Sequence, residues 1–245
     1  MTENIKAALE YAVELSQSED KIIQDQFGTE WYDANNFNLK QLEEIRHYPS
    51  ALHLNTLTSL VDYILSGLNG LLEQKLIVVV DNPREVYVYT EDDDRQKRTT
   101  LAIVEAVIPD FKFDKYYDME SFNIALQARF IDTDDRGLVI DYASKISIEN
   151  GADIEDDGIS QVTTIKNGIA SKGKAKAPNP VTLAAYRTFN EVEQPSSKFV
   201  FRINKDGNLA LFEADGGAWR LQAIQNIADY LRASFADFDN ITVLA

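Results

Sequence analysis

A run of strands in the middle of the chain constrains its fold more than any other feature. Residues 76–80 (LIVVV) form the longest strongly apolar stretch, and it has the length of a strand. Residues 81–84 (DNPR) predict a turn, and segments 85–90 and 99–108 are rich in β-branched and aromatic residues. The three segments therefore predict an antiparallel meander. Because its first strand is continuously apolar, we expect that strand to be covered on both faces.

Apolar residues recur at helical spacing in five further segments, and each segment predicts an amphipathic helix. Asn55 is a good cap for the second helix, Asp118 for the third, and Thr133 or Asp134 for the fourth, while the last helix follows residues 215–217 (DGG). The expected buried faces are Ile5, Leu9, Ala12 and Leu15; Leu57, Leu60, Val61, Ile64, Leu65, Leu68 and Leu72; Phe122, Ala125, Leu126 and Phe130; Leu138, Tyr142 and Ile146; and Leu221, Ile224, Ala228, Leu231 and Phe235.

The C-terminal part of the chain is rich in strands. The segments that predict them are 162–170, 181–189, 198–204, 209–213 and a terminal strand at 241–244. Asp206-Gly207 lies between the third and fourth of these and is a strong hairpin signal. Residues 172–180 (KGKAKAPNP) predict a long exposed loop.

Together these elements predict an α+β fold, with an antiparallel meander and flanking helices followed by a second antiparallel sheet and a C-terminal helix. Strands and helices do not alternate regularly, which argues against a doubly wound parallel sheet. The Gly- and Asp-rich stretch 149–158 is the best boundary. It divides an acidic helix-and-meander part, 1–150, from a strand-rich part, 151–245. These parts either fold separately or pack as one domain.

The composition bears on chemistry. The 245 residues include no Cys and only two His, against 40 acidic and 24 basic residues. Polar catalysis at neutral pH most often uses a thiolate, an imidazole or a metal that they hold. We therefore expect a protein that is not an enzyme and has no cofactor, although carboxylates that bind a metal remain an alternative.

The charge and the termini restrict partners and location. Residues 1–150 carry 14 basic and 28 acidic residues, which disfavours direct binding of DNA. The N-terminus has no signal-peptide pattern, and no apolar run approaches the length needed to cross a membrane. We expect a cytoplasmic protein.

Two groups of charged residues are candidate contacts, and a tyrosine pair is a third feature. The cations Lys172, Lys174, Lys176 and Arg187 are candidates for an anionic ligand, and the acidic candidates for a partner surface are Glu91, Asp92, Asp93, Asp94, Asp132, Asp134 and Asp135. Acids in such clusters are more often solvated turns, and none matches a calcium-binding loop. Tyr87 and Tyr89 share one face of their strand, which suits burial, a subunit interface or base stacking.

Four segments of the chain carry a resemblance to known proteins: residues 55–64 (NTLTSLVDYI), 118–127 (DMESFNIALQ), 177–203 (APNPVTLAAYRTFNEVEQPSSKFVFRI) and 211–219 (LFEADGGAW). They resemble an uncharacterised family of bacteriophage and prophage proteins from Gram-positive hosts. The resemblance implies a protein from an early or accessory region, near recombination and replication genes, that acts in the host cytoplasm. It brings no catalytic residues with it.

Three functional hypotheses follow. The first is a non-enzymatic phage accessory protein that works as a homo-oligomer, as soluble proteins commonly do. The second is an acidic decoy that inhibits a nucleic-acid-binding defence protein of the host. The third is an oligomeric binder, or sponge, of a small anionic nucleotide.

Overall fold

The computed structural model describes residues 6, 22–24, 30–33, 39–41, 50–92, 97–146, 154–158, 160–167 and 171–245. The chain divides into two compact units, one of residues 1–49 with 92–99 and one of residues 50–91 with 100–245. The described strands of the first unit are β1 (Ile22–Gln24), β2 (Glu30–Asp33) and β3 (Leu39–Gln41), which pair antiparallel in that order. The helix expected near Ile5 and Leu9 lies outside the described residues.

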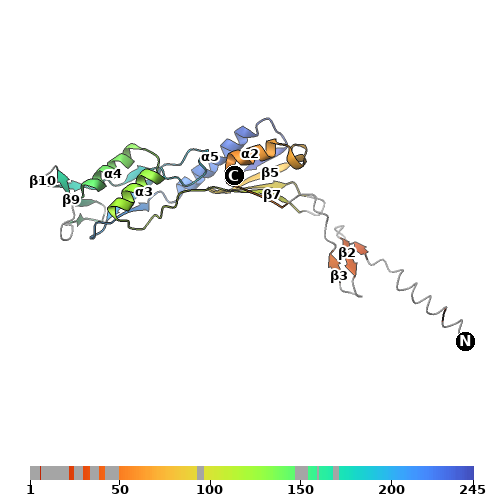
Figure 1. Ribbon diagram of the computed structural model, residues 1–245, viewed down its shortest axis with the longest axis horizontal. Helices are drawn as coiled ribbons and strands as arrows, with labels where there is room; N and C mark the ends of the chain where they lie inside the picture. The colour runs from red at the N-terminus through yellow and green to blue at the C-terminus, as the bar shows by residue number, and fades with distance from the viewer. Residues whose placement is uncertain are drawn as a thin grey trace. The chain divides into compact units, whose positions relative to one another are not determined.

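A five-stranded sheet forms one half of the second unit (Figure 1). Its centre is the predicted meander of β5 (Leu76–Asn82), β6 (Glu85–Thr90) and β7 (Thr100–Glu105). The edge strands are β14 (Ile241–Leu244), parallel to β5, and β4 (Leu52–Leu54), parallel to β7. The meander is confirmed, and distant segments convert it into a mixed sheet in the order β14-β5-β6-β7-β4.

Helices cover one face of this sheet. They are α2 (Leu57–Leu65) and α5 (Ala218–Ser234), and Figure 1 shows both on the same side of the strands. Burial alternates along β5, with Leu76 and Val78 buried and Ile77 half-exposed. The expectation that residues 76–80 are covered on both faces is therefore wrong. A run of five apolar residues cannot by itself distinguish a strand with two covered faces from one with a single covered face.

Helix α2 is shorter than its apolar stripe predicts. Its cap is Thr56, whose side chain accepts from the Ser59 N–H at 3.0 Å, rather than the expected Asn55. The helix ends at Leu65 because Gly67 and Asn69 have φ of 66° and 57°, in the left-handed region. The 3-10 helix η1 (Leu68–Glu73) follows, and Leu68 is 60% exposed.

The buried face of α5 matches the predicted one at Ala228, Leu231 and Phe235 but differs near the start of the helix. The helix buries Trp219, Ala223, Ile227, Ala228 and Leu231, whereas Leu221, which was expected in the core, is 74% exposed. Two alanines in the buried row allow close approach to a neighbouring layer, as α5 makes with β5 and β14. The spacing of apolar residues in the sequence had favoured the larger side chain of Leu221 for the buried face.

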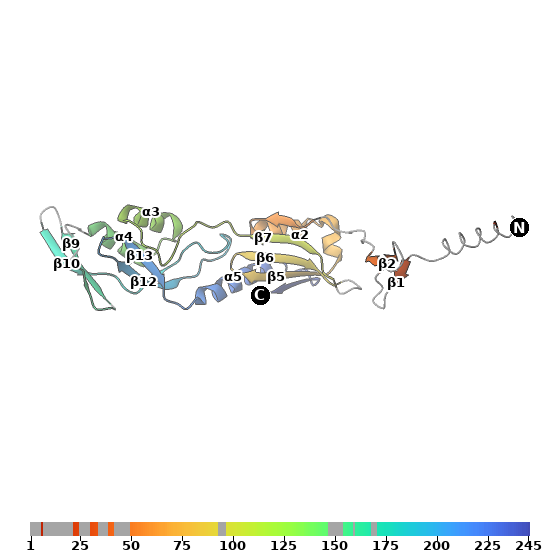
Figure 2. The same cartoon turned by 90° about the horizontal axis from the view of Figure 1, so that it is seen from below.

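The other half of the second unit is built on a three-stranded antiparallel sheet (Figure 2). Its strands are β11 (Val181–Leu183), β12 (Ser197–Ile203) and β13 (Leu209–Glu213). The predicted strand 181–189 ends early, and the hairpin at Asp206-Gly207 is present, with Gly207 at φ 78°.

Helices α3 (Met119–Arg129) and α4 (Asp134–Lys145) pack on the inner face of this sheet. Phe122 and Val139 from the helices and Phe199, Phe201 and Leu211 from the strands share one core. The predicted parts 1–150 and 151–245 both contribute to it. In α4, Thr133 is the cap, and Leu138, which was expected in the core, is 59% exposed.

A small third sheet replaces the exposed loop that was expected at 172–180. It consists of β8 (Glu155–Asp156), β9 (Gln161–Asn167) and β10 (Ser171–Lys176), in the order β10-β9-β8. Strand β10 pairs antiparallel with β9, with Lys176 opposite Val162. The hydroxyls of Tyr142 on α4 and Thr163 on β9 lie 2.6 Å apart and are buried, which attaches this sheet to the helical layer.

The cap of α3 gives a pH-dependent prediction. The Ser121 N–H donates to Asp118 at 2.8 Å and lowers the pKa of that carboxyl below its ordinary value of 3.8. The stabilisation is therefore present above pH 3.8 and is lost as the pH falls through the lower, folded-state pKa. Asp118→Asn keeps an acceptor but does not titrate. Urea unfolding at a series of pH values across this window should show that the free energy of unfolding falls more steeply with decreasing pH in the natural chain than in Asp118→Asn. An equal fall in the two proteins would contradict this.

Candidate functional site

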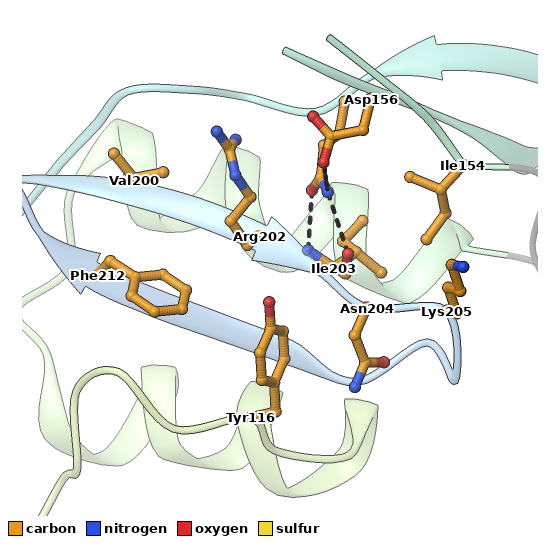
Figure 3. A pocket seen from close by; sticks show the side chains of 10 residues that line it. Tyr116, Ile154, Asp156, Val200, Arg202, Ile203, Asn204, Lys205 and Phe212 are labelled. Atoms are coloured by element: carbon orange, nitrogen blue, oxygen red, sulfur yellow. Dashed lines mark hydrogen bonds between the residues drawn. The ribbon is translucent and has the colours of Figure 1, made fainter. Parts of the chain in front are cut away.

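A hollow lined by described residues lies over the outer face of the three-stranded sheet. It has a volume of about 750 Å³. Figure 3 shows the side chains that line it, which come from β12, β13 and the turn between them, from β8 and the residue before it, from β9 and from the segment before α3. Its walls are the aromatic residues Tyr116 and Phe212, the aliphatic residues Ile154, Val200 and Ile203, and the polar residues Asp156, Gln161, Arg202, Asn204 and Lys205.

The alternation of β12 and β13 positions the floor of this pocket. Phe199 and Phe201 of β12 point into the core, so Val200 and Arg202 point outward. Phe212 of β13 lies opposite Val200 in the antiparallel register. The same period of two that builds the core therefore presents an aromatic ring and a guanidinium on the outer face.

Gln161 fixes the rim of the pocket to its floor. Its side-chain amide accepts from the Ile203 N–H at 2.9 Å and donates to the Ile203 carbonyl at 3.1 Å, as a neighbouring strand would. The same nitrogen donates to Asp156 at 2.9 Å. Because Gln161 is 4% exposed, these bonds hold β8 and β9 beside β12 in a low-dielectric environment.

The cations of the pocket are held in different ways. Arg202 donates to the Gly158 carbonyl at 3.0 Å, and its charge also helps to lower the pKa of Asp156. The larger contributions to that shift are hydrogen bonds from the Gly158 N–H and the Gln161 amide. Lys205 is exposed in the β12–β13 turn and has no carboxylate within ion-pair distance among the described residues.

The aromatic wall of the pocket presents an accessible ring. Tyr116 is 40% exposed, and its ring contacts Phe212 edge-on with 6.1 Å between centroids. Figure 3 shows its hydroxyl directed into the cavity. Within the described ranges that hydroxyl makes no hydrogen bond, so it is available to a ligand as a donor or an acceptor.

A second surface with functional character is the face of the five-stranded sheet opposite α2 and α5. We call the central part of this face, made of Ile77, Val79, Tyr87, Tyr89 and Ile103, the open face. The paired residues Thr242 and Leu244 of β14 and His53 of β4 flank it. All five side chains of the open face are half-buried, and the two tyrosine rings stack with 6.0 Å between centroids. Figure 2 shows strands β5, β6 and β7 with the helices behind them. Such faces normally carry polar residues when water covers them.

The rim of the open face is acidic. Glu85 and Glu105 lie opposite each other in the β6–β7 register. Tyr87 donates to Glu85 at 3.3 Å, and the negative charge of Glu85 raises the pKa of the Tyr87 hydroxyl. The tyrosine is therefore neutral at physiological pH.

The structure places Arg187 inside the protein rather than on a ligand-facing surface. It is 3% exposed, and its guanidinium donates to Glu213 at 2.6 Å and to Ser197 at 2.5 Å. It also stacks on the Trp219 ring, 4.0 Å from the centroid. Burial lowers the pKa of Arg187 to about 10, so it stays charged at neutral pH. These contacts are those of a structural cation.

The predicted lysine candidates are brought together on one strand. Lys172, Lys174 and Lys176 occupy alternate positions of β10, opposite Lys166, Thr164 and Val162 of β9. Lys176 is exposed. Arg187 is not part of this strand, and neither Arg187 nor Lys176 is among the described residues that line the pocket.

Several of the predicted acidic residues have partners among the described residues. Glu91 pairs with Lys75 at 3.2 Å and Asp92 with Arg98 at 3.9 Å, while Asp93 and Asp94 lie outside the described residues. Asp132 pairs with Arg136, and Asp135 accepts from the Thr182 N–H at 2.6 Å. Asp132 and Asp134 border a second hollow on α4, of about 640 Å³.

The pocket residues were missed in the sequence for an identifiable reason. Arg202 and Phe212 lie in predicted strands, but they become neighbours only through the antiparallel register of β12 and β13. The hairpin signal at Asp206-Gly207 fixes that register approximately. Tyr116 and Asp156 come from elements outside the hairpin, and no local pattern relates them to it.

Two further observations concern metals and membranes. In the part of the chain that the structure describes, no three His, Asp or Glu side chains gather closely enough to hold a metal ion. Of the described helices, none is sufficiently long and apolar to cross a bilayer.

Comparison with known proteins gives no assignment: no family model, no curated protein and no solved structure matches this chain.

Proposed function

We propose that this chain is a non-enzymatic phage accessory protein that works as a homo-oligomer in the cytoplasm of the infected host. The setting rests on the resemblance of segments such as 177–203 and 211–219 to phage and prophage proteins. The association rests on the open face, through which we propose that two copies meet.

The observation that supports association is the composition of the open face. A solvent-covered face of an antiparallel sheet is ordinarily polar, yet here β5 presents Ile77 and Val79 and β6 presents Tyr87 and Tyr89. Contiguous apolar surface on a folded chain commonly marks a contact site. Tyrosine is also enriched at protein interfaces, because its ring is apolar and its hydroxyl tolerates water.

A second copy fits this face better than a nucleic acid does. The open face contains no Lys or Arg, and the Glu85–Glu105 rim and the net charge of −16 repel phosphates. An apolar centre is complementary to itself under two-fold symmetry. The exposed Arg84, beside Glu85 in the β5–β6 turn, offers a cation to the acidic rim of a related copy.

The size of the face predicts a reversible dimer. The whole face has five strands of three to seven residues. With about 4.8 Å between strands and about 3.3 Å per residue, its area is about 400 Å². A standard stable interface buries about 800 Å² on each partner. We therefore expect the average native mass to rise with concentration.

Light scattering on the full chain tests this proposal. We expect the mass to move from one chain towards two as concentration increases, and Tyr87→Ser combined with Tyr89→Ser to hold the protein at one chain. Leu221→Ser is the matched control, because Leu221 is 74% exposed on α5, away from the open face. Its mass curve should follow that of the natural chain. A monomer at every concentration, or dimers in the double variant, would overturn the proposal.

A further inference from the structure

We propose that the pocket over the three-stranded sheet binds one small planar anion of the mononucleotide class per chain. This inference is independent of self-association, because residues of a single chain make the whole pocket (Figure 3). The cations of this pocket, Arg202 and Lys205, are not the ones that the sequence indicated.

The aromatic wall provides the contact for a planar group. Tyr116 and Phe212 line the same side of the cavity, and the 40% exposure of Tyr116 leaves ring surface for stacking. Stacking on an aromatic side chain tolerates any base, because every base has a π-face. The aliphatic residues Ile154 and Val200 extend the apolar lining beyond the rings.

The charges of the pocket select an anion. Among the described residues that line the pocket, Arg202 and Lys205 are cations and Asp156 is the single carboxylate, so these side chains together carry a net positive charge within a chain of −16. Arg202 is positioned by its bond to the Gly158 carbonyl at 3.0 Å. A guanidinium held in this way, with an exposed ammonium lining the same pocket, is a common arrangement for a phosphate group.

The dimensions and the overall charge favour a single nucleotide over a strand. A volume of about 750 Å³ lies in the usual range for small-molecule sites. A nucleic-acid strand would extend beyond the pocket over a strongly acidic protein, where its phosphates are repelled. The open hydroxyl of Tyr116 offers one further hydrogen bond to a sugar or base.

Isothermal titration calorimetry of the full chain tests the proposal. The probes are AMP, GMP, CMP and UMP, with adenosine and inorganic phosphate as the two halves of one ligand. We expect at least one nucleotide to bind with a stoichiometry of one per chain. Adenosine and phosphate should each bind at least about tenfold more weakly, because each lacks half of the contacts.

Variants of the pocket identify the contacts. Arg202→Gln and Tyr116→Ala should each weaken nucleotide binding by about tenfold or more. Lys205→Gln tests the charge without disturbing the fold, since Lys205 is exposed in a turn. Lys198→Gln is the matched control: it removes the same charge from the outer face of the same strand, outside the pocket, and should bind as the natural chain does.

The outcomes separate this proposal from the one on self-association. The variant with both Tyr87→Ser and Tyr89→Ser should bind nucleotide unchanged, whatever its mass. No heat with any of the four nucleotides would overturn the inference. So would adenosine binding as tightly as AMP, which would show that the cations play no part. Phosphate binding as tightly as AMP would reduce the site to a simple anion site and would also overturn it.

Discussion

Replacing Gln194 by Met is expected to lower the free energy of unfolding by about 4 kcal/mol, since buried backbone groups that lose a partner each cost about 1–3 kcal/mol. Gln194 is 4% exposed, and its oxygen accepts from the N–H groups of Arg187 at 2.9 Å and Thr188 at 3.2 Å. Its nitrogen donates to the carbonyls of Phe189 at 2.8 Å and Val192 at 3.3 Å. Methionine has a similar shape but makes no hydrogen bond to any of these four backbone groups.

This loss should extend beyond a single loop. The segment that Gln194 organises connects the two halves of the second unit, because Thr188 donates to the Pro83 carbonyl in the β5–β6 turn at 2.5 Å. Asn226 of α5 donates to the Glu193 carbonyl at 2.9 Å. We therefore expect one cooperative transition at a lower midpoint instead of local fraying.

Urea unfolding followed by tryptophan fluorescence and by far-UV circular dichroism measures this effect. Gln222→Met is the control, because Gln222 is exposed on α5 and, among the described residues, donates only to the Asn226 side chain. It should change stability by less than about 0.5 kcal/mol. A loss below about 1 kcal/mol in Gln194→Met would show that the segment rearranges and satisfies its backbone groups in another way.

Arg187→Met is expected to lower the free energy of unfolding by about 3 kcal/mol, the low end for breaking a buried ion pair. The Arg187 side chain is 4% exposed, whereas that of its partner Glu213 is 27% exposed and retains some contact with water. The substitution also removes the stacking on Trp219 and the bond to Ser197. Met retains most of the apolar volume.

A double variant separates the ion pair from the packing. Glu213→Gln added to Arg187→Met removes the unpaired carboxylate, so it should recover part of the lost stability. Arg187→Lys keeps the charge but lacks the planar fork, and should still be destabilised. Chemical denaturation of the natural chain, Arg187→Met, Glu213→Gln and the double variant gives the coupling. If the double variant is as unstable as the sum of the single changes, the Glu213 charge is not the cause.

Several elements could be predicted from the sequence because their signals are local. The meander of β5, β6 and β7 follows from β-branched runs separated by turn residues. The caps Asp118 and Thr133 follow from side chains that accept from the backbone two or three residues later. The Asp206-Gly207 hairpin follows from the positive φ of a glycine.

Predictions that depended on what a segment packs against were less accurate. Residues 171–176 form strand β10 because β9 supplies its hydrogen-bond partners, although the lysines and glycine in this segment disfavour a strand. Leu138 and Leu221 have the spacing of core residues, but the neighbouring layers lie against other faces of α4 and α5. Propensity describes a segment alone, whereas burial depends on its neighbours.

The sequence by itself determined the α+β class, the position of most helices and strands, and the acidic charge that disfavours nucleic acid. Only the tertiary structure decided that β4 and β14 flank the meander, that one face of the resulting sheet is open, and that Tyr116, Asp156, Arg202 and Phe212 meet around one pocket. The physical reason is distance along the chain. Local hydrogen bonds and periodicity act over a few residues, while the pocket joins residues about a hundred positions apart through sheet register and core packing.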